Sequence, residues 1–551
     1  MYSKLKIGLI VDGELASKYV HELVDWANTT DALCVSHLII QDRPPAAGRA
    51  GVFYGLLRKN PLTRARDALW RVKTRLESAR VARVEAFKGY EKTYNVGKLV
   101  PAKIRLTPIV STSGFIYRFS DSDLAKVREE GFDVLIRCGS GILRGGILSS
   151  ARLGVVSFHH GDNRINRGGV AGFWEVYTRQ ASTGFIVQRL TEELDGGDVI
   201  LRGFIPTQDT HLLNATMLFK KSYFHLRALL LQIAQTRELP APEPRYPYSG
   251  KLVTAPRFHE VVIYLCKQVA RSFSKRVRRV LRYRERWGVC FTKSDWRSAV
   301  MRRGTQIDTP PGHFLADPFV VTREGRTCVF AEDFDFKTSK AHISAFELTE
   351  DGARELGIAV QETFHLSFPF LFEWEGSLYM CPETRAAKEI RIYECTEFPL
   401  KWKLASVAKK NVVAADTLIF SKAGLWWMLT GISRTEPHDC SELYLYWATT
   451  PLSGDWQPHA LNPILIDPQS ARNGGLLRDG NELIRVAQYL QFGSYGISTR
   501  LFRITKLSRD EYAEEYVASI TPDFMPGISG THHFHSNGVY SVWDCKRWER
   551  V

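Results

Sequence analysis

A serine, a histidine and an aspartate stand at the ends of two apolar segments in the first half of the chain. Ser157 and His159 belong to the run 154–160 (GVVSFHH), and Asp195 stands in the polar loop that follows the apolar run 184–190. Catalytic and binding groups collect at strand ends in open α/β sheets. An imidazole and a carboxylate placed there can relay a proton, so these residues predict acid–base chemistry.

Five glycines divide the second half of the chain into repeats. Each is a turn glycine followed by an apolar segment, and the steps between them are 51, 48, 56 and 58 residues. Five units of this length are typical of a β-propeller with one four-stranded sheet per blade, and a β-sandwich with fortuitous spacing is the alternative. The glycines are Gly325, Gly376, Gly424, Gly480 and Gly538.

The same repeat predicts which polar side chains share one face of the propeller. The innermost strand of each blade begins at one mouth of the channel, so residues about eight before and about seven after each glycine return to that mouth. Carboxylates in an aromatic-lined funnel suit carbohydrate binding or acid–base chemistry on glycosides, and no metal-ligand spacing accompanies the histidines, so no metal site is predicted. The predicted face comprises Asp317, Glu332, Asp333, Glu383, Asp416, Arg472, Gln488, His532 and His533.

The elements that position the first group of residues follow from the hydrophobic pattern. Apolar strands at 6–11, 32–40 and 134–137 alternate with helical segments, which indicates a doubly wound α/β domain. A proline-rich stretch at 239–244 ends it, and a basic helical pattern follows. The predicted domains are therefore 1–240, a basic helical linker at 241–285, and an all-β propeller at 286–551.

Positive charge is concentrated in two segments. The chain of 551 residues has a formal net charge of +15, and 257–303 holds fourteen Lys and Arg against three Asp and Glu, while 58–92 holds eleven against four. These segments predict a surface for an anionic partner, namely lipid headgroups, nucleotide-sugar phosphates or nucleic acid, and a solvated helix face is the alternative. Nine cysteines without CxxC pairs, and no signal peptide or apolar run of membrane-spanning length, predict a cytoplasmic protein. The basic segment 257–286 is either a linking helix or a contact with the inner face of the membrane.

The first half resembles the 10-formyltetrahydrofolate-dependent formyltransferase family. That family carries Asn-x-His, a Leu-Pro-x-x-Arg-Gly loop, and Asp-x-Gly before a final strand. Here the three motifs stand in the same order as Ser157-Phe158-His159, Asn166-Arg167-Gly168-Gly169 and Leu194-Asp195-Gly196-Gly197. Serine replaces the family asparagine and the Leu-Pro pair is absent, which leaves the oxyanion-donating role of that amide to Ser157, Asn163 or Asn166.

The resemblance implies that an amine attacks the formyl carbon while His159 and Asp195 stabilise charge or move the proton. It names Ser157, His159 and Asp195 as catalytic residues and 10-formyltetrahydrofolate as the donor. The residues that it places at the folate are Gly139, Ser140, Arg167, Gly168, Gly196 and Gly197.

The second half resembles five-bladed glycosidase-like propellers, in particular the propeller found beside sugar transferases that build glycosylinositol phosphoceramides. The resemblance rests on Ala316-Asp317-Pro318-Phe319, Pro382-Glu383-Thr384, Asp416-Thr417-Leu418 and Ala471-Arg472-Asn473. In such glycosidases an aspartate of the first blade is the base and a glutamate is the acid, which would be Asp317 and Glu383. A propeller of this kind can also bind sugar without cleaving it, so both roles stay open.

Together these observations predict a formyltransferase that acts on an amino group, with a nucleotide- or lipid-linked amino sugar of surface polysaccharide assembly as the acceptor and the propeller as a glycan-binding part. Two alternatives remain: a carbohydrate-binding scaffold with a degenerate transferase domain, and a propeller-based glycoside hydrolase or transglycosidase. Methionyl-tRNA is disfavoured as an acceptor, and the basic segments keep nucleic acid open as a partner.

Overall fold

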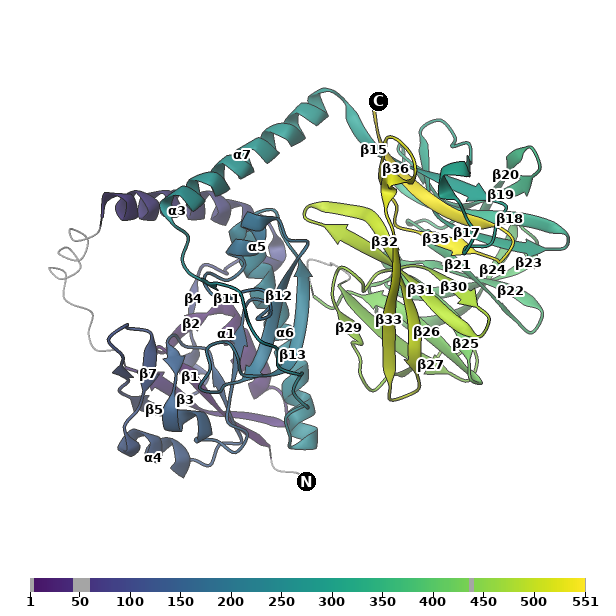
Figure 1. Ribbon diagram of the computed structural model, residues 1–551. Coiled ribbons are helices and arrows are strands. Elements are labelled where there is room, and N and C mark those ends of the chain that lie inside the picture. The colour runs from purple at the N-terminus through teal and green to yellow at the C-terminus, as the bar shows by residue number, and fades with distance from the viewer. Residues whose placement is uncertain (1–3, 43–59, 436–440, 551) are drawn as a thin grey trace. The chain divides into compact units, whose positions relative to one another are not determined.

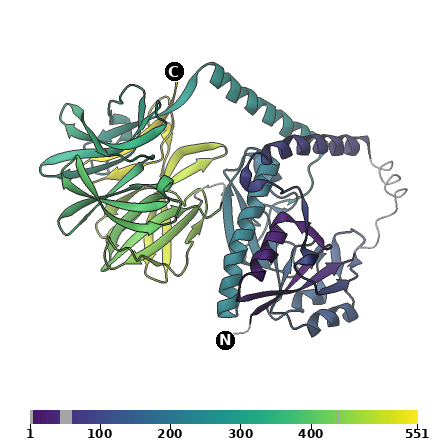
Figure 2. The same cartoon turned by 180° about the vertical axis from the view of Figure 1, so that it is seen from behind.

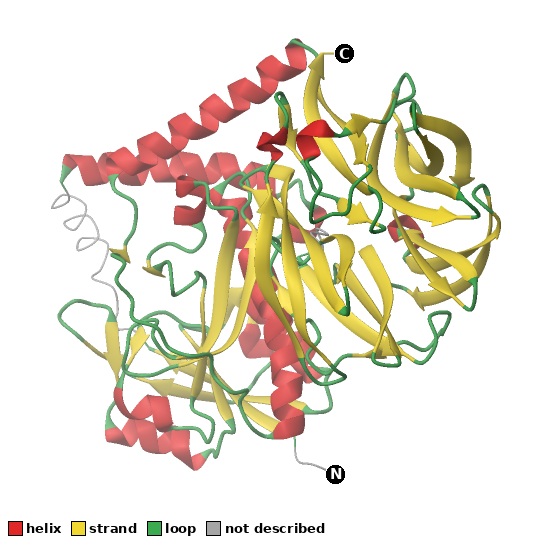
Figure 3. Ribbon diagram, turned by 45° about the vertical axis from the view of Figure 1, so that its right-hand side comes forward, coloured by secondary structure: helices red, strands yellow, loops and turns green. Residues whose placement is uncertain are grey.

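The computed structural model describes residues 4–42, 60–435 and 441–550, and these form two compact units that divide after Arg271. The first unit holds most of the helices, whereas the second is built almost entirely from strands (Figures 1 and 3). The division falls inside helix α7 (Phe258–Val280), so the helix belongs to both units. None of the helices in these described ranges has the length and apolarity needed to cross a lipid bilayer.

The first unit is built around one seven-stranded mixed sheet. Six strands run in the same direction and β12 alone is antiparallel to both of its neighbours. The spatial order is β13 (Asp198–Pro206), β12 (Ser182–Arg189), β10 (Val155–His159), β8 (Val134–Arg137), β1 (Leu5–Val11), β3 (Leu33–Gln41) and β5 (Lys103–Leu106).

Helices cover both faces of this sheet (Figure 2). Alternate residues of β1 pack with α1 and α6 in one buried cluster, while Ile10 packs with α4 in another. Because the sheet is buried on both faces, its parallel strands are nearly continuous apolar runs, as the sequence predicts for a doubly wound domain. The helices are α1 (Lys18–Asn28), α3 (Pro61–Val81), α4 (Asp121–Glu129), α5 (Phe173–Thr178) and α6 (His211–Thr236).

The first unit also contains short strands outside its seven-stranded sheet. The segment after Asp12 first forms β2 (Leu15–Ser17), which pairs with β4 (Thr93–Asn95), so α1 begins only at Lys18. The remaining small strands are β6 (Ile109–Val110), β7 (Ile116–Arg118), β9 (Ile142–Leu143), β11 (Arg167–Gly168) and β14 (Leu252–Val253).

A buried polar network fastens the basic helix α3 to its neighbours. The Glu77 carboxylate accepts hydrogen bonds from the Tyr264 hydroxyl (2.6 Å) and the Leu212 amide (2.9 Å). Lys73 Nζ lies 3.3 Å from Glu77 and 2.6 Å from His211 Nδ1. Burial lowers the pKa of Lys73, and the Glu77 charge opposes that shift. The basic insertion is therefore docked on α6 and α7 through paired buried charges, whose separation would be costly.

The second unit contains five antiparallel sheets whose inner strands contact one another in a closed ring. The inner strands β17, β21, β25, β30 and β35 touch in that order, and β35 touches β17 again. This is a five-bladed propeller. The first four sheets are β17 (His313–Arg323), β18 (Arg326–Asp335), β19 (Lys340–Thr349) and β20 (Gly352–Val360); β21 (Ser367–Trp374), β22 (Ser377–Glu383), β23 (Glu389–Glu397) and β24 (Lys401–Lys410); β25 (Ala414–Lys422), β26 (Leu425–Ile432), β27 (Glu442–Ala448), β28 (Gln457–Pro458) and β29 (Leu465–Ile466); and β30 (Asn473–Asp479), β31 (Glu482–Gln491), β32 (Ser494–Leu507) and β33 (Tyr512–Ile520).

The fifth sheet closes the ring with strands from both ends of the unit. Its final strand β36 (Ser541–Arg550) pairs along its whole length with β15 (Tyr283–Thr292), the first strand of the unit. The other members of this sheet are β16 (Thr305–Gln306), β34 (Ile528–Gly530) and β35 (Phe534–Ser536).

The five repeat glycines lie where the sequence predicts, in the turns between the first and second strands of the sheets. All five have positive φ, between 57° and 89°, which glycine adopts without strain. In the first blade Arg323 pairs with Arg326, so Glu324 and Gly325 alone form the turn. This two-residue turn with two left-handed residues matches the twist of the flanking strands.

Candidate functional site

His159 and Asp195 meet at the end of β10. Asp195 Oδ1 lies 3.4 Å from His159 Nδ1, and His159 Nε2 donates a hydrogen bond to the Asn166 carbonyl (2.9 Å). Because Nε2 is engaged by the backbone, Nδ1 is the ring nitrogen that faces the carboxylate. The structure thus brings together the two residues that the sequence selects for proton transfer.

The Asp195 loop is locked to the Arg-Gly loop. Asp195 has a left-handed backbone (φ 49°), its carboxylate accepts from the Gly168 amide (2.9 Å), and its carbonyl accepts from Asn163 Nδ2 (3.0 Å). Arg167 Nε in turn donates to the Asn163 carbonyl (3.0 Å). The Asn166-Arg167-Gly168 segment therefore fixes the position and side-chain rotamer of Asp195.

Arg137 extends the site, and no motif in the sequence predicts this role. Its Nη1 donates to Ser157 Oγ (3.3 Å), and its Nε is buried without a hydrogen-bond partner among the described residues. Burial lowers the pKa of Arg137, and the charges of Asp195 and Asp12 oppose that shift. The sequence feature that could have identified Arg137 is its position as a charged residue at the end of the apolar strand VLIR. Ser157 Oγ accepts the hydrogen bond from Arg137 Nη1 and donates to the Phe158 carbonyl (3.2 Å), and Arg137 Nη2 donates to the Gly141 carbonyl. Within the described residues, Nε of Arg137 is therefore the buried donor of this group that lacks an acceptor.

Of the three catalytic candidates, Ser157 lines a cavity of about 480 Å³ and His159 and Asp195 do not. Arg137, Gly139, Ser157 and His160 line its polar part, together with Asp12, whose carboxylate accepts from the Ser140 amide (3.0 Å). Its apolar part comes from α1 and α6 and includes Tyr19, Val20, Phe219 and Tyr223. His159 is not among the lining residues, so Ser157 and Arg137 present this site to the cavity.

A second cavity of about 380 Å³ adjoins the Asp195 loop at Glu193, Gly196 and Gly197. Arg167, Gly196 and Gly197 line it, so the six residues predicted to contact folate do not surround one space. Its remaining wall is strongly polar and includes Arg164, Glu193, Arg202, Glu243, Arg245 and Tyr248.

Two of the predicted folate-binding glycines are required by the chain's own packing. A Cβ at Gly197 would lie 2.3 Å from the Arg189 carbonyl oxygen, and one at Gly168 would lie 2.8 Å from the Val253 carbonyl oxygen. A Cβ at Gly139 would lie 2.6 Å from Gln41 Nε2, the end of a flexible side chain, so Gly139 is less constrained than Gly197 and Gly168. Those two glycines allow backbone segments to approach each other, and that role accounts for them without a ligand.

Repeated bulges place the propeller carboxylates at the start of the inner strands. Asp317, Phe368 and Asp416 occupy equivalent positions in three successive blades, with left-handed φ of 49°, 47° and 52°. Each lies where the register between the first two strands shifts. A bulge redirects a side chain that regular pleating would keep in the sheet, so these side chains turn toward the channel axis.

Most of the predicted face residues meet in one buried cluster. Arg472 binds the Asp416 carboxylate with both Nε (2.6 Å) and Nη2 (3.1 Å), and Gln488 Nε2 reaches the same carboxylate at 3.3 Å. His532 lies between two carboxylates, 3.2 Å from Asp317 and 2.8 Å from Asp544. The exposed fractions of Asp317, Asp416 and His532 are only 2–5%.

The cluster holds more carboxylates than cations, and this shifts their pKa values. Burial and the nearby Asp416 charge raise the pKa of Glu383 to about 7, and burial with the Asp317 charge raises the pKa of Glu332. Although burial acts to lower it, the charges of Asp544 and Asp317 raise the pKa of His532 to about 10. Glu383 is therefore able to gain or lose a proton near neutral pH.

Two residues predicted for the face, Asp333 and His533, make their main contacts outside the buried cluster. Asp333 points to its own blade, where it contacts His313 Nδ1 (2.6 Å), His342 Nε2 (3.3 Å) and Ser344 Oγ (2.8 Å). Adjacent strand residues face opposite sides, so Glu332 and Asp333 cannot both face the cluster. His533 packs against Phe319 and Phe368, and burial lowers its pKa to about 3.

The structure brings together three side chains of the types that bind cations, although their spacing in the sequence does not predict such a group. Asp317, His532 and Asp544 each offer an oxygen or nitrogen atom within 4.8 Å of the others, and all three are buried. The same arrangement also fits a protonated His532 that balances the two carboxylates without a metal ion. The raised pKa of His532 favours this protonated state. The prediction of no metal stays a prediction.

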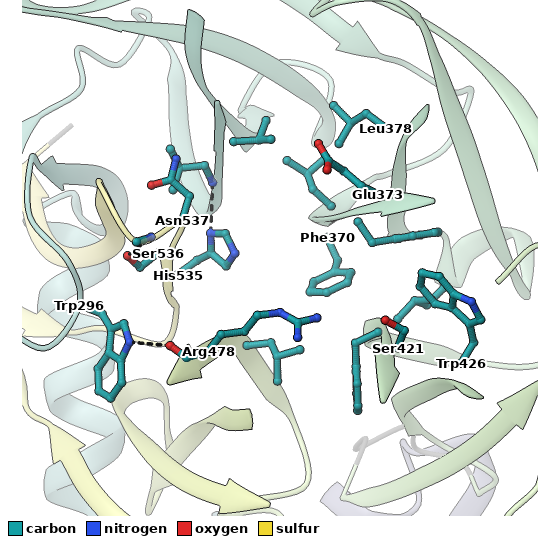
Figure 4. Close-up of a pocket in the computed structure, with 18 residues that line it drawn as sticks. Trp296, Phe370, Glu373, Leu378, Ser421, Trp426, Arg478, His535, Ser536 and Asn537 are labelled. Carbon is teal, nitrogen blue, oxygen red and sulfur yellow. Dashed lines mark hydrogen bonds between the residues drawn. The ribbon is translucent and has the colours of Figure 1, made fainter. Parts of the chain in front are cut away.

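A cavity of about 430 Å³ lies at the opposite, hairpin end of the propeller channel (Figure 4). Phe370, Trp296 and Trp426 line it, and His535 accepts a hydrogen bond from the Val320 amide (3.3 Å). None of the carboxylates of the buried cluster is among its lining residues. The channel therefore has an aromatic end and an acidic end, separated by residues such as Phe319 and His533.

Comparison with known proteins identifies relatives of the propeller. Residues 300–526 match the family model "Glucosamine inositolphosphorylceramide transferase 1, N-terminal". Proteins named glucosamine inositolphosphorylceramide transferase 1 from Oryza sativa subsp. japonica and Arabidopsis thaliana are each 36% identical, over 210 and 214 residues. Each match covers 37% of this chain, and 28% and 27% of the relative, so the chain spans about a quarter of these proteins. Cluster residues from Asp317 to Gln488 lie inside the matched segment.

The solved structures similar to this chain are more distant. Glycinamide ribonucleotide transformylase 1 from Symbiobacterium toebii is 15% identical, with a TM-score of 0.28, and the match covers 44% of this chain and 95% of that one. A family 117 glycoside hydrolase from Zobellia galactanivorans is 12% identical, with a TM-score of 0.31, and the match covers 47% and 90%.

The raised pKa of Glu383 predicts a pH-dependent contribution to stability. The folded protein binds this proton more tightly than the unfolded chain, whose glutamates titrate near 4.5, so stability falls as the pH rises from about 4.5 to about 7. Glu383→Gln keeps the side chain neutral. We expect it to raise the free energy of unfolding by roughly 3 kcal/mol at pH 8 and by little at pH 5.

Urea unfolding followed by circular dichroism at pH 5, 6, 7 and 8 measures this difference. The matched control is Glu373→Gln on the hairpin side, which removes an exposed carboxylate and should leave the pH profile unchanged. Parallel profiles for wild type and Glu383→Gln would contradict the assignment.

Proposed function

We propose that the first unit transfers a formyl group from 10-formyltetrahydrofolate to an amino group, and that the acceptor is a nucleotide- or lipid-linked amino sugar. The observation that carries the proposal is the pairing of His159 with Asp195 directly beside the donors Arg137 and Ser157. Acyl transfer needs both functions, because a proton must leave the amine and negative charge must be stabilised on oxygen.

The chain's own residues can divide the reaction between them. The amine nitrogen forms a bond to the formyl carbon, the bond from that carbon to the folate N10 breaks, and the amine proton ends on N10. Arg137 and Ser157 would stabilise the oxyanion of the tetrahedral intermediate, a task in which one donor is worth two to three decades in rate. His159 and Asp195 would hold the amine proton between Nδ1 and Oδ1, which face each other at 3.4 Å.

The cavities support a separate place for each substrate. The polar cavity beside Gly196 offers Arg167, which stacks on Tyr248 and suits a carboxylate of a folate glutamate tail. Arg164 and Arg245 also line it but are paired with Asp162 and Asp198. The larger cavity offers the Asp12 carboxylate, which suits an amine and the hydroxyls of a sugar. We place the donor at the first and the acceptor at the second, so that the His159–Asp195 pair lies between them.

The link to sugars rests on the propeller. Its relatives are named glucosamine inositolphosphorylceramide transferases, and glucosamine is an amino sugar. Its acidic cluster, with Arg472 and Gln488, has the hydrogen-bonding groups that sugar hydroxyls require. The propeller would then bind the glycan or carrier that bears the amine, in a cytoplasmic assembly of surface polysaccharide.

Substitution at the proposed site tests the transfer directly. His159→Asn and Asp195→Asn should each lower folate-dependent formylation of nucleotide-linked amino sugars by about 10²- to 10⁴-fold. Ser157→Asn, which adds an amide donor, should preserve or raise the rate. The measurement is formamide formation by mass spectrometry at saturating donor.

The KM values provide the control on substrate placement. Arg167→Ala should raise the KM for the donor, and Asp12→Asn the KM for the acceptor, while exposed His259→Asn changes neither. Unchanged kcat in both His159→Asn and Asp195→Asn would exclude the pair from the reaction.

A second candidate function is glycoside cleavage or transfer by the propeller. The observation that favours it is Glu383, whose pKa of about 7 suits a general acid, near the ionised Asp317. Burial acts to raise the pKa of Asp317, but the charge and hydrogen bond of His532 lower it, as a base requires. The two carboxylates would thus have the opposite protonation states that glycosidic cleavage uses.

Incubation with glucosamine-containing oligosaccharides separates the two functions. Hydrolysis that Glu383→Gln and Asp317→Asn abolish, and that His159→Asn leaves intact, would assign glycosidase activity to the propeller. Oligosaccharide binding without cleavage would leave the propeller as the glycan-binding part.

A further inference from the structure

Helix α7 presents a row of apolar side chains to solvent. Val269, Phe273 and Val280 have exposed fractions of 68%, 68% and 72%, against 0–1% for Val261 and Tyr264 on the same helix. The spacing of four and seven residues puts the three exposed side chains on one face. Leaving three large apolar side chains on one helix face in water is costly, at about 1.5–3 kcal/mol each relative to full burial.

The first half of α7 is held by the first unit through a different face. Val261 and Tyr264 are buried, Lys267 Nζ donates to the Tyr177 carbonyl (2.8 Å), and Gln268 Nε2 donates to the Asp209 carbonyl (2.8 Å). Tyr264 also joins the buried network of α3. The exposed apolar row is therefore presented by a helix whose rotation about its own axis is fixed.

The second half of α7 is densely cationic. Lys275, Arg276, Arg278 and Arg279 are all exposed, and Arg282 follows the helix directly. The sequence 261–284 contains no aspartate or glutamate. An anionic partner would therefore meet no negatively charged residue, and hence no repulsion, from this stretch of sequence.

Apolar residues on one face with cations beside them are the pattern of a helix that lies in a membrane interface. The apolar side chains leave water for the acyl boundary, and each cation near an anionic leaflet adds attraction. We infer that α7 binds an anionic lipid surface, with Val269, Phe273 and Val280 inserted below the headgroups and Arg276 and Arg279 at the phosphates. This binding surface is independent of the proposed transfer reaction.

Vesicle flotation tests the inference with the full-length protein. The vesicles are phosphatidylcholine alone, or phosphatidylcholine with 30 mol% phosphatidylglycerol. We expect wild type to float with the anionic vesicles and not with the neutral ones. Val269→Ser/Phe273→Ser/Val280→Ser should lower the partition coefficient at least about tenfold, because the inserted apolar area is lost. Arg276→Gln/Arg279→Gln should lower it by about 30-fold, and 0.5 M salt should have a similar effect.

A matched variant controls for general surface changes. Ile109→Ser/Leu461→Ser/Val539→Ser removes three apolar side chains with exposed fractions of 53–60% outside α7, and it should float like wild type. Failure of wild type to float, or equal flotation with neutral vesicles, would overturn the inference. So would self-association of wild type without lipid that the α7 triple variant abolishes, because the row would then be a protein interface. Circular dichroism confirms that each variant is folded.

Discussion

Three aspartates in this chain depend on the same backbone constraint. Asp195, Asp317 and Asp416 all adopt the left-handed region, at φ of 49°, 49° and 52°. Aspartate tolerates this region better than β-branched or bulky residues do. Asp317 and Asp416 lie at bulges of inner propeller strands, whereas Asp195 lies in the loop between β12 and β13. In each case the carboxylate faces other polar groups, which are His159 in the first unit and His532 and Arg472 in the second. Without these departures, both folds would keep their cores but lose their polar clusters.

The two clusters differ in how their charge is balanced. In the first unit one carboxylate is held by a backbone amide and faces one imidazole, with Arg137 nearby, so charge and proton are confined to a pair. In the propeller, several carboxylates share Arg472 and His532, and burial together with the neighbouring negative charges raises the pKa values of Glu332 and Glu383. The first arrangement suits a single proton transfer beside an oxyanion, whereas the second suits hydroxyl binding or acid–base chemistry on sugars.

The sequence predicts both folds because their signals are local. Apolar runs predict the strands of the first sheet, and five turn glycines predict the hairpins of the propeller and the positions of Asp317 and Asp416. The sequence reading assigns Asp333 to the wrong face. Neighbouring strand residues face opposite sides, so a spacing that is uncertain by one residue cannot tell which of Glu332 and Asp333 faces the cluster. The sequence reading also misses Arg137 and Asp12, which contact the site through neighbouring strands rather than through a motif. The glycines at Gly168 and Gly197 show the converse, since packing against carbonyl oxygens explains residues that a motif assigns to a ligand.

The central claim is that the first unit binds a formyl-folate donor next to His159 and Asp195. Calorimetric titration of the full-length protein with a stable 10-formyltetrahydrofolate analogue tests it most directly, with the His159→Ala/Asp195→Ala variant measured in parallel. The account predicts saturable binding with a stoichiometry of one per chain for both proteins, because the donor contacts lie on the adjoining loops. Absence of binding to wild type at high ligand concentration would contradict it, and would move the search for function to the acidic cluster of the propeller.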